Sequence, residues 1–218
     1  MSTSSLPSVK RALRKQIQTI LRSIPPEGIL AQLYLPTVHS EIQTFELIKH
    51  ALDAGKSVYV PFIPAGSNTD MQMLRLYEED VPMTEDGSTD SGLKGDGWNR
   101  DKWGIPVLPL TRKDTGLERE DASTSAHYLD LILLPGVAFS PTASSLFSRL
   151  GHGKGYYDKY ITQYRSICAG KNRPGPKLIG LALKEQFLDK NMVPIGEWDA
   201  NLDEVLVGDH VRTLSEDN

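Results

Sequence analysis

The chain has 218 residues, with little cysteine and no long apolar run. Cys168 is its single cysteine, which excludes an intrachain disulfide and a zinc–cysteine cluster. No apolar run approaches the roughly 18 residues that a membrane-spanning helix needs, and the first residues lack the apolar block of a secretory signal. We therefore expect a soluble protein of a reducing, intracellular compartment.

Acidic residues are missing from residues 1–26, which carry five bases. The rest of the chain is acidic, with 19 bases against 28 acids, and the whole chain has a net charge of −4. This balance argues against general nucleic-acid binding. An acid-free start rich in Arg and Ser is typical of a mitochondrial presequence, or of a helix that offers positive charge to an anionic ligand. We favour the helix.

The size and composition are those of one folded domain. A mass of 24.2 kDa, with 39% apolar and 24% charged residues, excludes wholesale disorder and makes two full domains improbable. We predict a single domain over residues 1–218.

Apolar spacing predicts alternating helices and strands. Residues 9–24 repeat apolar side chains at helical intervals and are followed by two prolines, and residues 41–52 are also a predicted helix. Residues 149–160 are predicted to form a Gly-rich loop that runs into a helix ending at Arg165. Predicted strands are residues 29–35, 57–62, 71–77, 131–134, 178–183 and 205–207. Polar surface loops are predicted within 78–101, chiefly 84–100, and at 111–127. The alternation indicates an α/β protein with an open sheet and helices on its faces.

Three glycines alternate with His152 and Lys154 just before a predicted helix. Alternating glycines let backbone N–H groups approach a phosphate without interference from Cβ, and the helix N-terminus adds a favourable dipole. Lys154 supplies a mobile cation and Arg149 a planar fork, which together could neutralise a phosphoryl group in transfer. The alternative is an ordinary tight turn. The spacing matches neither the Walker motif nor the dinucleotide fingerprint.

Two acidic residues and one tryptophan each have two interpretations. Asp158, just after the glycines, and Asp199 could be outer ligands of a magnesium ion that accompanies ATP. An Asp in the first turn of a helix is more often a capping residue. Trp103 could stack on a flat ring, although a tryptophan in a loop is more often a packing anchor.

Seven short sequence motifs, called words below, occur in one colinear order and resemble those of the 5-formyltetrahydrofolate cyclo-ligase family, also called 5,10-methenyltetrahydrofolate synthetase. The words are Lys-Arg-Ala-Leu-Arg at 10–14, Met-Gln-Met-Leu-Arg at 71–75, Lys-Trp-Gly-Ile-Pro at 102–106, Asp-Leu-Ile-Leu-Leu-Pro-Gly-Val-Ala-Phe at 130–139, Arg-Leu-Gly-His-Gly-Lys-Gly-Tyr-Tyr-Asp at 149–158, Leu-Ala-Leu-Lys-Glu-Gln at 181–186 and Asp-x-x-x-Asp-Glu-Val-Leu at 199–206. The word at 149–158 is the most specific of them.

The resemblance implies a fold and a reaction. The fold is a single three-layer, open-sheet α/β domain similar to phosphosugar isomerases and coenzyme A transferases. The reaction is ATP-dependent cyclisation of 5-formyltetrahydrofolate to 5,10-methenyltetrahydrofolate, a carbon–nitrogen ligation that releases ADP and phosphate. The expected partners are these small molecules, with Mg2+ as the cofactor. No nucleic-acid or membrane partner is expected, and the protein is expected to be a monomer. The compartment is expected to be the cytoplasm, with a mitochondrial pool left open.

The resemblance also implies roles for individual residues. The catalytic pair is Lys154 and Arg149, and Asp158 and Asp199 hold the metal. ATP contacts are expected at Lys10, Arg11, Ala12, Leu13, Arg14, Arg149, Leu150, Gly151, His152, Gly153, Lys154, Gly155, Tyr156 and Tyr157. Folate contacts are expected at Leu35, Glu41, Met71, Met73, Trp103, His152, Gly153, Lys154, Gly155 and Tyr156.

One departure from the family pattern motivates an alternative. The family has a second helix between the first helix and the strand that holds Leu35, whereas residues 24–29 cross that interval here. The alternative is therefore a non-catalytic protein of the same fold that binds folate or nucleotide. A sugar-phosphate isomerase or transferase of similar architecture is a further alternative, and it would need no ATP.

Overall fold

The structure is a computed structural model that describes residues 30–32, 44–64, 66–67, 70–81, 99–100, 105–207 and 210–212. The helix predicted at 9–24 and the interval at 24–29 lie outside these residues, as does most of the loop predicted at 84–100. None of the described helices is long and apolar enough to cross a membrane.

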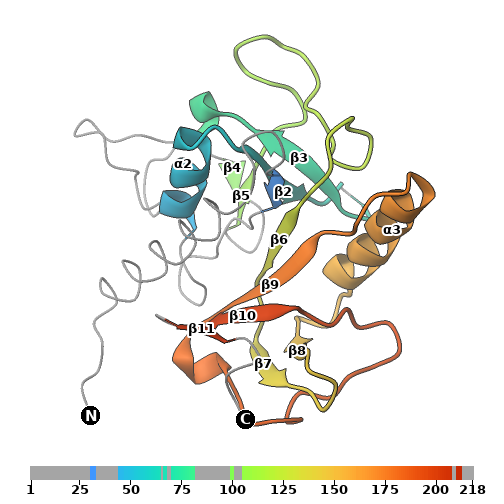
Figure 1. Cartoon of the computed structure of the whole chain (residues 1–218). Coiled ribbons are helices and arrows are strands. Elements are labelled where there is room, and N and C mark those ends of the chain that lie inside the picture. Colours follow the sequence, from blue (N-terminus) through green and yellow to red (C-terminus); the bar gives the residue numbers. More distant parts are fainter. Residues whose placement is uncertain are drawn as a thin grey trace.

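A seven-stranded sheet forms the centre of the fold (Figure 1). Its strands, in spatial order, are β11 (His210–Arg212), β10 (Glu204–Val207), β9 (Lys177–Ala182), β6 (Leu131–Leu134), β1 (Leu30–Gln32), β2 (Ser57–Phe62) and β3 (Gln72–Leu76). The five inner strands, from β10 to β2, are parallel. The two edge strands, β3 and β11, are antiparallel to their neighbours. The predicted α/β class is confirmed, and all the strands predicted in the described residues are present.

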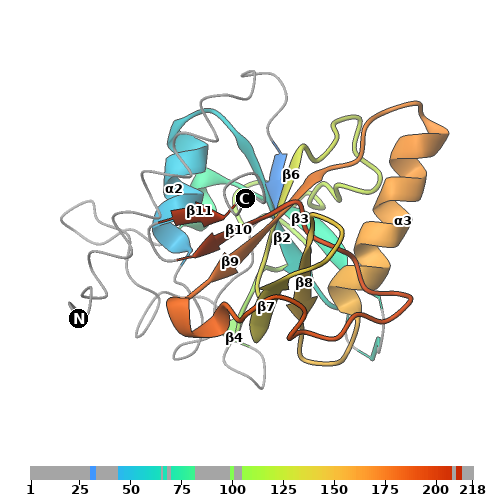
Figure 2. The same ribbon diagram turned by 60° about the horizontal axis from the view of Figure 1, so that its bottom comes forward.

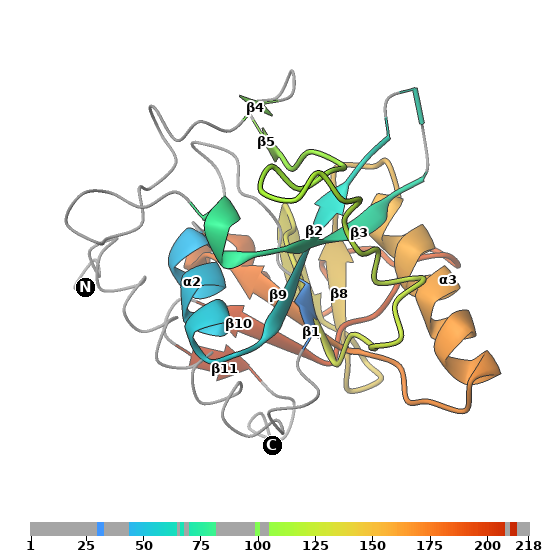
Figure 3. The ribbon, with the colours of Figure 1, turned by 90° about the horizontal axis from the view of Figure 1, so that it is seen from above.

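Helices α2 (Phe45–Asp53) and α3 (Tyr156–Gly170) cover opposite faces of this sheet (Figures 1 and 3). Along a strand, successive side chains enter different cores. Val58 and Val60 pack with the apolar residues of α2, whereas Tyr59 packs with those of α3. All four residues of β6 are buried, as its continuous apolar run predicts for a strand covered on both faces.

Helix α3 continues to Gly170, beyond the predicted end near Arg165. The buried residues Tyr160, Ile161, Tyr164 and Cys168 form one stripe that faces the sheet, and this stripe keeps the chain helical to the end. The Tyr164 hydroxyl accepts a hydrogen bond from the Leu129 backbone N–H at 2.7 Å. Burial raises the pKa of Tyr164 to about 12, so the hydroxyl stays protonated at neutral pH.

Several short elements were not predicted. An antiparallel hairpin of β7 (Ala138–Pro141) and β8 (Phe147–Leu150) joins β6 to α3. A small ladder pairs β4 (Asn99–Arg100) with β5 (Pro106–Val107), and two 3₁₀ turns occupy Glu78–Asp80 and Lys184–Gln186. The Ser-rich turn of the hairpin, with Ser145 at φ 59°, gives no alternating pattern from which the two strands could be predicted.

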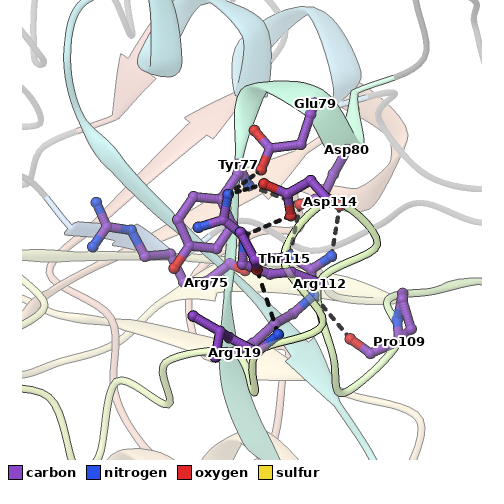
Figure 4. Close-up of polar contacts among 10 residues, drawn as sticks. Arg75, Tyr77, Glu79, Asp80, Pro109, Arg112, Asp114, Thr115 and Arg119 are labelled. Atoms are coloured by element: carbon purple, nitrogen blue, oxygen red, sulfur yellow. Dashed lines mark hydrogen bonds and ion pairs between the residues drawn. The ribbon is translucent and has the colours of Figure 1, made fainter.

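The segment at 111–127 is irregular, as predicted, yet it is firmly attached to β3. The Arg75 N–H donates to the Glu120 carbonyl, and the Ala122 N–H donates to the Met73 carbonyl, each at 2.9 Å. The guanidinium of Arg119 is buried and donates to both oxygens of Asp80 at 2.6 Å (Figure 4). The segment at 111–127 therefore packs against one side of the core and is not a loop surrounded by solvent.

Candidate active site

The site is located by the order of the strands. The chain runs outward from β1 to β2 in one direction, and from β1 to β6, β9 and β10 in the other. In open α/β sheets, ligands bind at the carboxyl ends of the strands where the order reverses. The reversal here lies between β1 and β6, and the hairpin β7–β8 and the glycine loop follow the carboxyl end of β6. Figure 2 turns this edge of the sheet forward.

The glycine loop occupies residues 151–155 and ends as the cap of α3. Gly153 and Gly155 have φ of 80° and 68°, a region that glycine enters without strain. Lys154 is exposed between them and forms no ion pair within the described residues. The N–H groups of the first helical turn have no partners inside the helix and attract an anion. The loop thus presents backbone donors and a free ammonium group at one place.

Arg149 lies in β8, two residues before Gly151, and is not part of the loop as the predicted bounds of 149–160 had it. Only 6% of its side chain is exposed. Its Nη2 donates to both oxygens of Asp158, at 3.1 and 3.0 Å, and its Nη1 donates to the Pro135 carbonyl at 3.3 Å. The ring of Tyr157 lies 5.5 Å from its Cζ. The buried Nε has no hydrogen-bond partner among the described residues.

The two predicted metal ligands come from neighbouring segments. Asp158 Oδ1 accepts the Ala200 N–H at 3.2 Å, next to Asp199, while both Asp158 oxygens also accept Arg149. The Asp199 carboxylate accepts the Gly196 N–H at 2.7 Å and is exposed. Within the described ranges, no three His, Cys, Asp or Glu side chains gather as a metal cluster. Asp199 is available to a hydrated cation, and Asp158 is engaged by Arg149.

The comparison with known proteins identifies the family. The sequence profile of the 5-formyltetrahydrofolate cyclo-ligase family matches residues 27–208. The chain belongs to this family. A Caenorhabditis elegans protein that bears the family's name is 34% identical, with 93% of this chain and 94% of that protein covered. The mouse 5-formyltetrahydrofolate cyclo-ligase is 30% identical, with 96% and 98% covered.

Solved structures show the same fold. The NMR structure of Aquifex aeolicus 5,10-methenyltetrahydrofolate synthetase superposes with a TM-score of 0.58 at 20% identity, covering 99% of this chain and 87% of that one. The Mycoplasma pneumoniae 5,10-methenyltetrahydrofolate synthetase gives a TM-score of 0.54 at 18% identity, with 96% and 90% covered. The α/β fold expected from the family resemblance is therefore confirmed.

The other predicted residues of this family member divide into three groups. Gly151, His152, Tyr156 and Tyr157 flank Lys154 in the loop and the first helical turn, and Leu150 ends β8. Met73 is fully buried in the core beside α3, and Met71 keeps 9% of its surface exposed. The remaining predicted residues lie outside the described part of the structure, namely Lys10, Arg11, Ala12, Leu13, Arg14, Leu35, Glu41 and Trp103.

Gln186 is a site-supporting residue to which the sequence interpretation gave no role. Its amide nitrogen donates to the Gly136 carbonyl at 2.8 Å, and its amide oxygen accepts the Leu183 N–H at 2.9 Å. It therefore joins the turns that follow β6 and β9. A Cβ on Gly136 would lie 2.6 Å from the Phe139 ring and 3.1 Å from Arg149 Cγ, so glycine allows the chain to pass close to Arg149. Gly136 and Gln186 lie in the words at 130–139 and 181–186, and these words are the sequence feature that could have identified them.

A hollow of about 540 Å³ lies at the opposite end of α3 from the glycine loop. It is lined by Arg165, Ala169, Arg173, Gly175, Pro176, Lys177 and Asp203. Lys177 is paired with Glu204 at 2.7 Å, and Arg173 lies over the ring of Tyr128. The hollow is open, and the length of α3 separates it from the glycine loop. None of the predicted site residues that the structure describes lines this hollow.

Proposed function

We propose that this chain catalyses the ATP-dependent cyclisation of 5-formyltetrahydrofolate to 5,10-methenyltetrahydrofolate, with release of ADP and phosphate. The observation that carries this proposal is the glycine loop at 151–155, with its backbone donors and the exposed Lys154, next to the buried Arg149 of β8 at the switch point of the sheet. Membership of the cyclo-ligase family supplies the substrates.

In the proposed chemistry, phosphorylation turns the formyl oxygen from a poor leaving group into a good one. The formyl oxygen attacks the γ-phosphorus of ATP and ADP departs. N10 of the folate then attacks the formyl carbon and loses its proton, and the activated oxygen leaves as part of inorganic phosphate. Little covalent chemistry falls to the protein in such a transfer, so catalysis depends on alignment and on neutralising the charge of the moving phosphoryl group.

The described residues can perform these tasks. The ammonium group of Lys154 can follow the phosphoryl group because it is exposed and free of ion pairs within the described residues. The backbone donors of the loop are fixed in space and need no reorganisation during the transfer. Arg149 adds a second positive charge from a buried position, where its attraction for phosphate is less screened than in water.

Further binding residues are part of the same proposal. Residues 10–14 and 149–157 would contact ATP, with Lys10 and Arg14 facing the phosphates. Leu35, Glu41, Met71, Met73 and Trp103, with residues 152–156, would contact the folate. A magnesium ion bound to ATP would supply charge neutralisation, and Asp158 and Asp199 are the carboxylates that could hold it. The proposal also includes a monomer in the cytoplasm.

Turnover of the purified chain tests the reaction. With 5-formyltetrahydrofolate and MgATP, we expect the near-ultraviolet absorbance of the methenyl product to rise in step with ADP release. Binding of folate or nucleotide without any turnover would support the non-catalytic alternative, which no feature of the described residues favours. Conversion of a sugar phosphate without ADP formation would support the isomerase alternative and refute the ligase.

A further inference from the structure

Trp198 is the most exposed large apolar side chain of the described residues, with 78% of its surface accessible to solvent. Tryptophan is seldom left so exposed, because its ring is a large apolar surface. An exposed aromatic ring beside a ligand site is a typical stacking surface for a flat ring of the ligand. The place of Trp198 in the fold therefore indicates what it binds.

Trp198 lies next to the residues proposed to hold the phosphates and the magnesium ion. It is in the middle of a turn that the Asp199 N–H closes by donating to the Gly196 carbonyl at 3.3 Å. Two residues after Trp198, the Ala200 N–H donates to Oδ1 of Asp158, in the first turn of α3, at 3.2 Å. Consecutive Cα atoms are about 3.8 Å apart, so the Cα atoms of Trp198 and Ala200 lie within about 8 Å of each other.

The hairpin β7–β8 anchors this turn on both sides. Before the turn, the Val193 N–H donates to Ser140 Oγ at 3.0 Å, and Ser148 Oγ donates to the Val193 carbonyl at 3.3 Å. After the turn, Phe147 and Leu202 exchange two backbone hydrogen bonds of 3.0 and 2.8 Å. The indole ring is therefore presented on a fixed segment, which lowers the entropy lost when a ligand binds.

ATP and the folate each carry a flat ring, and the direction of phosphoryl transfer distinguishes them. The attacking and leaving oxygens lie roughly in line through the phosphorus, so the folate and ADP occupy opposite sides of the transferred group. Met71 and Met73, the proposed folate contacts, lie at the start of β3, at one edge of the sheet. Trp198 lies in the segment that joins β9 to β10, toward the other edge, and β6 with the glycine loop comes between. Trp198 is therefore on the side of ADP.

We propose that Trp198 stacks on the adenine ring of ATP. This inference rests on the proposed function, because it uses the directions from which the two substrates approach. Stacking uses the face of the ring and not its hydrogen-bonding edges. The contact should therefore strengthen the binding of ATP and ADP, and it should leave the binding of the folate and of the phosphate chain unaffected.

Steady-state kinetics of three variants test the contact. We expect Trp198→Ala to raise the KM for ATP by at least about fivefold, as loss of a base–aromatic stack does, while kcat and the KM for the folate stay within about twofold of the parent. Trp198→Leu should behave like Trp198→Ala because it is apolar without an aromatic face, whereas Trp198→Phe should stay within about threefold of the parent. An unchanged KM for ATP in Trp198→Ala or Trp198→Leu would overturn the inference, and so would a raised KM for the folate, which would place the ring at the pteridine.

A binding measurement separates the adenine ring from the phosphates. The affinities for ADP and for inorganic tripolyphosphate are measured by calorimetry with Mg2+ and without folate. We expect Trp198→Ala to weaken ADP by at least about fivefold and to keep tripolyphosphate within about twofold of the parent. Equal losses for the two probes would show that the substitution acts on the phosphate site through the neighbouring Asp199, and would overturn the inference.

A matched control and the parent separate the remaining outcomes. Leu117→Ala removes another exposed apolar side chain, which is 65% exposed in the segment at 111–127, and it should leave every one of these constants unchanged. Since Trp198 is also exposed, its variants should keep the Tm of the parent within a few degrees. A parent that binds ADP without turnover would refute the proposed function, and the ADP measurement would still decide the inference. An active parent whose Trp198→Ala variant keeps its affinity for ADP would overturn the inference alone.

Discussion

The buried pair of Arg119 and Asp80 gives the sharpest prediction about stability. The Arg119 side chain is 0% exposed and that of Asp80 is 9% exposed, and two hydrogen bonds of 2.6 Å join them. The other guanidinium donors reach the Pro109 carbonyl at 2.8 Å and the Arg75 carbonyl at 3.1 Å. The Asp80→Asn substitution keeps the shape and leaves the buried guanidinium without its counter-charge. We expect a loss of about 3–5 kcal/mol in the free energy of unfolding.

Urea and thermal unfolding measure this loss. For a chain of this size, 1 kcal/mol corresponds to roughly 2–4 °C in Tm, so the expected fall in Tm is about 6–20 °C. The control is Asp53→Asn, which breaks the Lys49–Asp53 pair of 2.8 Å on the surface of α2. These side chains are 29% and 54% exposed, and such pairs contribute roughly 0.3–0.5 kcal/mol.

Comparing Asp80→Asn with Asp53→Asn tests whether burial strengthens the contribution of an ion pair to stability. A loss for Asp80→Asn no larger than that for Asp53→Asn would refute the prediction, because burial would then have no effect on the pair. The double variant Arg119→Met with Asp80→Asn should recover part of the loss, since no uncompensated charge stays buried. A double variant less stable than Asp80→Asn would show that the packing of Arg119, and not its charge, stabilises the segment.

Three further predictions concern the loop and its surroundings. Lys154→Met should lower kcat by about 100-fold or more while Tm stays within a few degrees, because the side chain is exposed and acts on the phosphoryl group; near-parent turnover would remove that role. Gly155→Ala, at φ 68° with open space around it, should cost about 1–2 kcal/mol in unfolding experiments, whereas Gly170→Ala in α3 should not destabilise. Burial raises the pKa of Glu120. Hydrogen bonds from Ser125 and Arg75 lower this pKa by more than burial raises it, so the net shift is downward. Glu120 therefore stabilises the fold above its unfolded pKa of about 4.3, and this stability is lost as pH falls through the lower, folded value; Glu120→Gln should flatten the acid limb of the stability curve, and an unchanged limb would contradict the assignment.

The sheet was largely predictable because its signals are local. The run at 131–134 has no polar residue, which is typical of a strand covered on both faces, and the structure buries all four side chains. The strand at 57–62 was predicted with its observed bounds. The hairpin at 138–150 was missed because its strands are short, with Pro141 in one of them and a Ser-rich turn between them, so no period of two is visible.

The character of the segment at 111–127 was not predictable. Its polar composition is typical of an exposed loop, and the backbone is indeed irregular. Arg119 is nevertheless buried because Asp80 receives it from 39 residues away. No local pattern encodes such a partner, since a charged residue in a polar segment is usually solvated. Long-range pairing of this kind becomes visible only when the fold brings the segments together.

The candidate site was less predictable than the sheet and more predictable than the segment at 111–127. The reason is that its charged residues lie close together in the sequence. Arg149, Lys154 and Asp158 lie within one strand–loop–helix unit, so a single word can specify their types and order. The word does not specify the contact that gives Asp158 its role, because an Asp in the first turn of a helix can cap the helix, hold a cation or pair with an arginine. The contact with Arg149 arises because β8 brings that guanidinium to the start of α3. Sequence therefore predicts which charged residues lie together in this unit, and their pairing depends on the strand that precedes the loop.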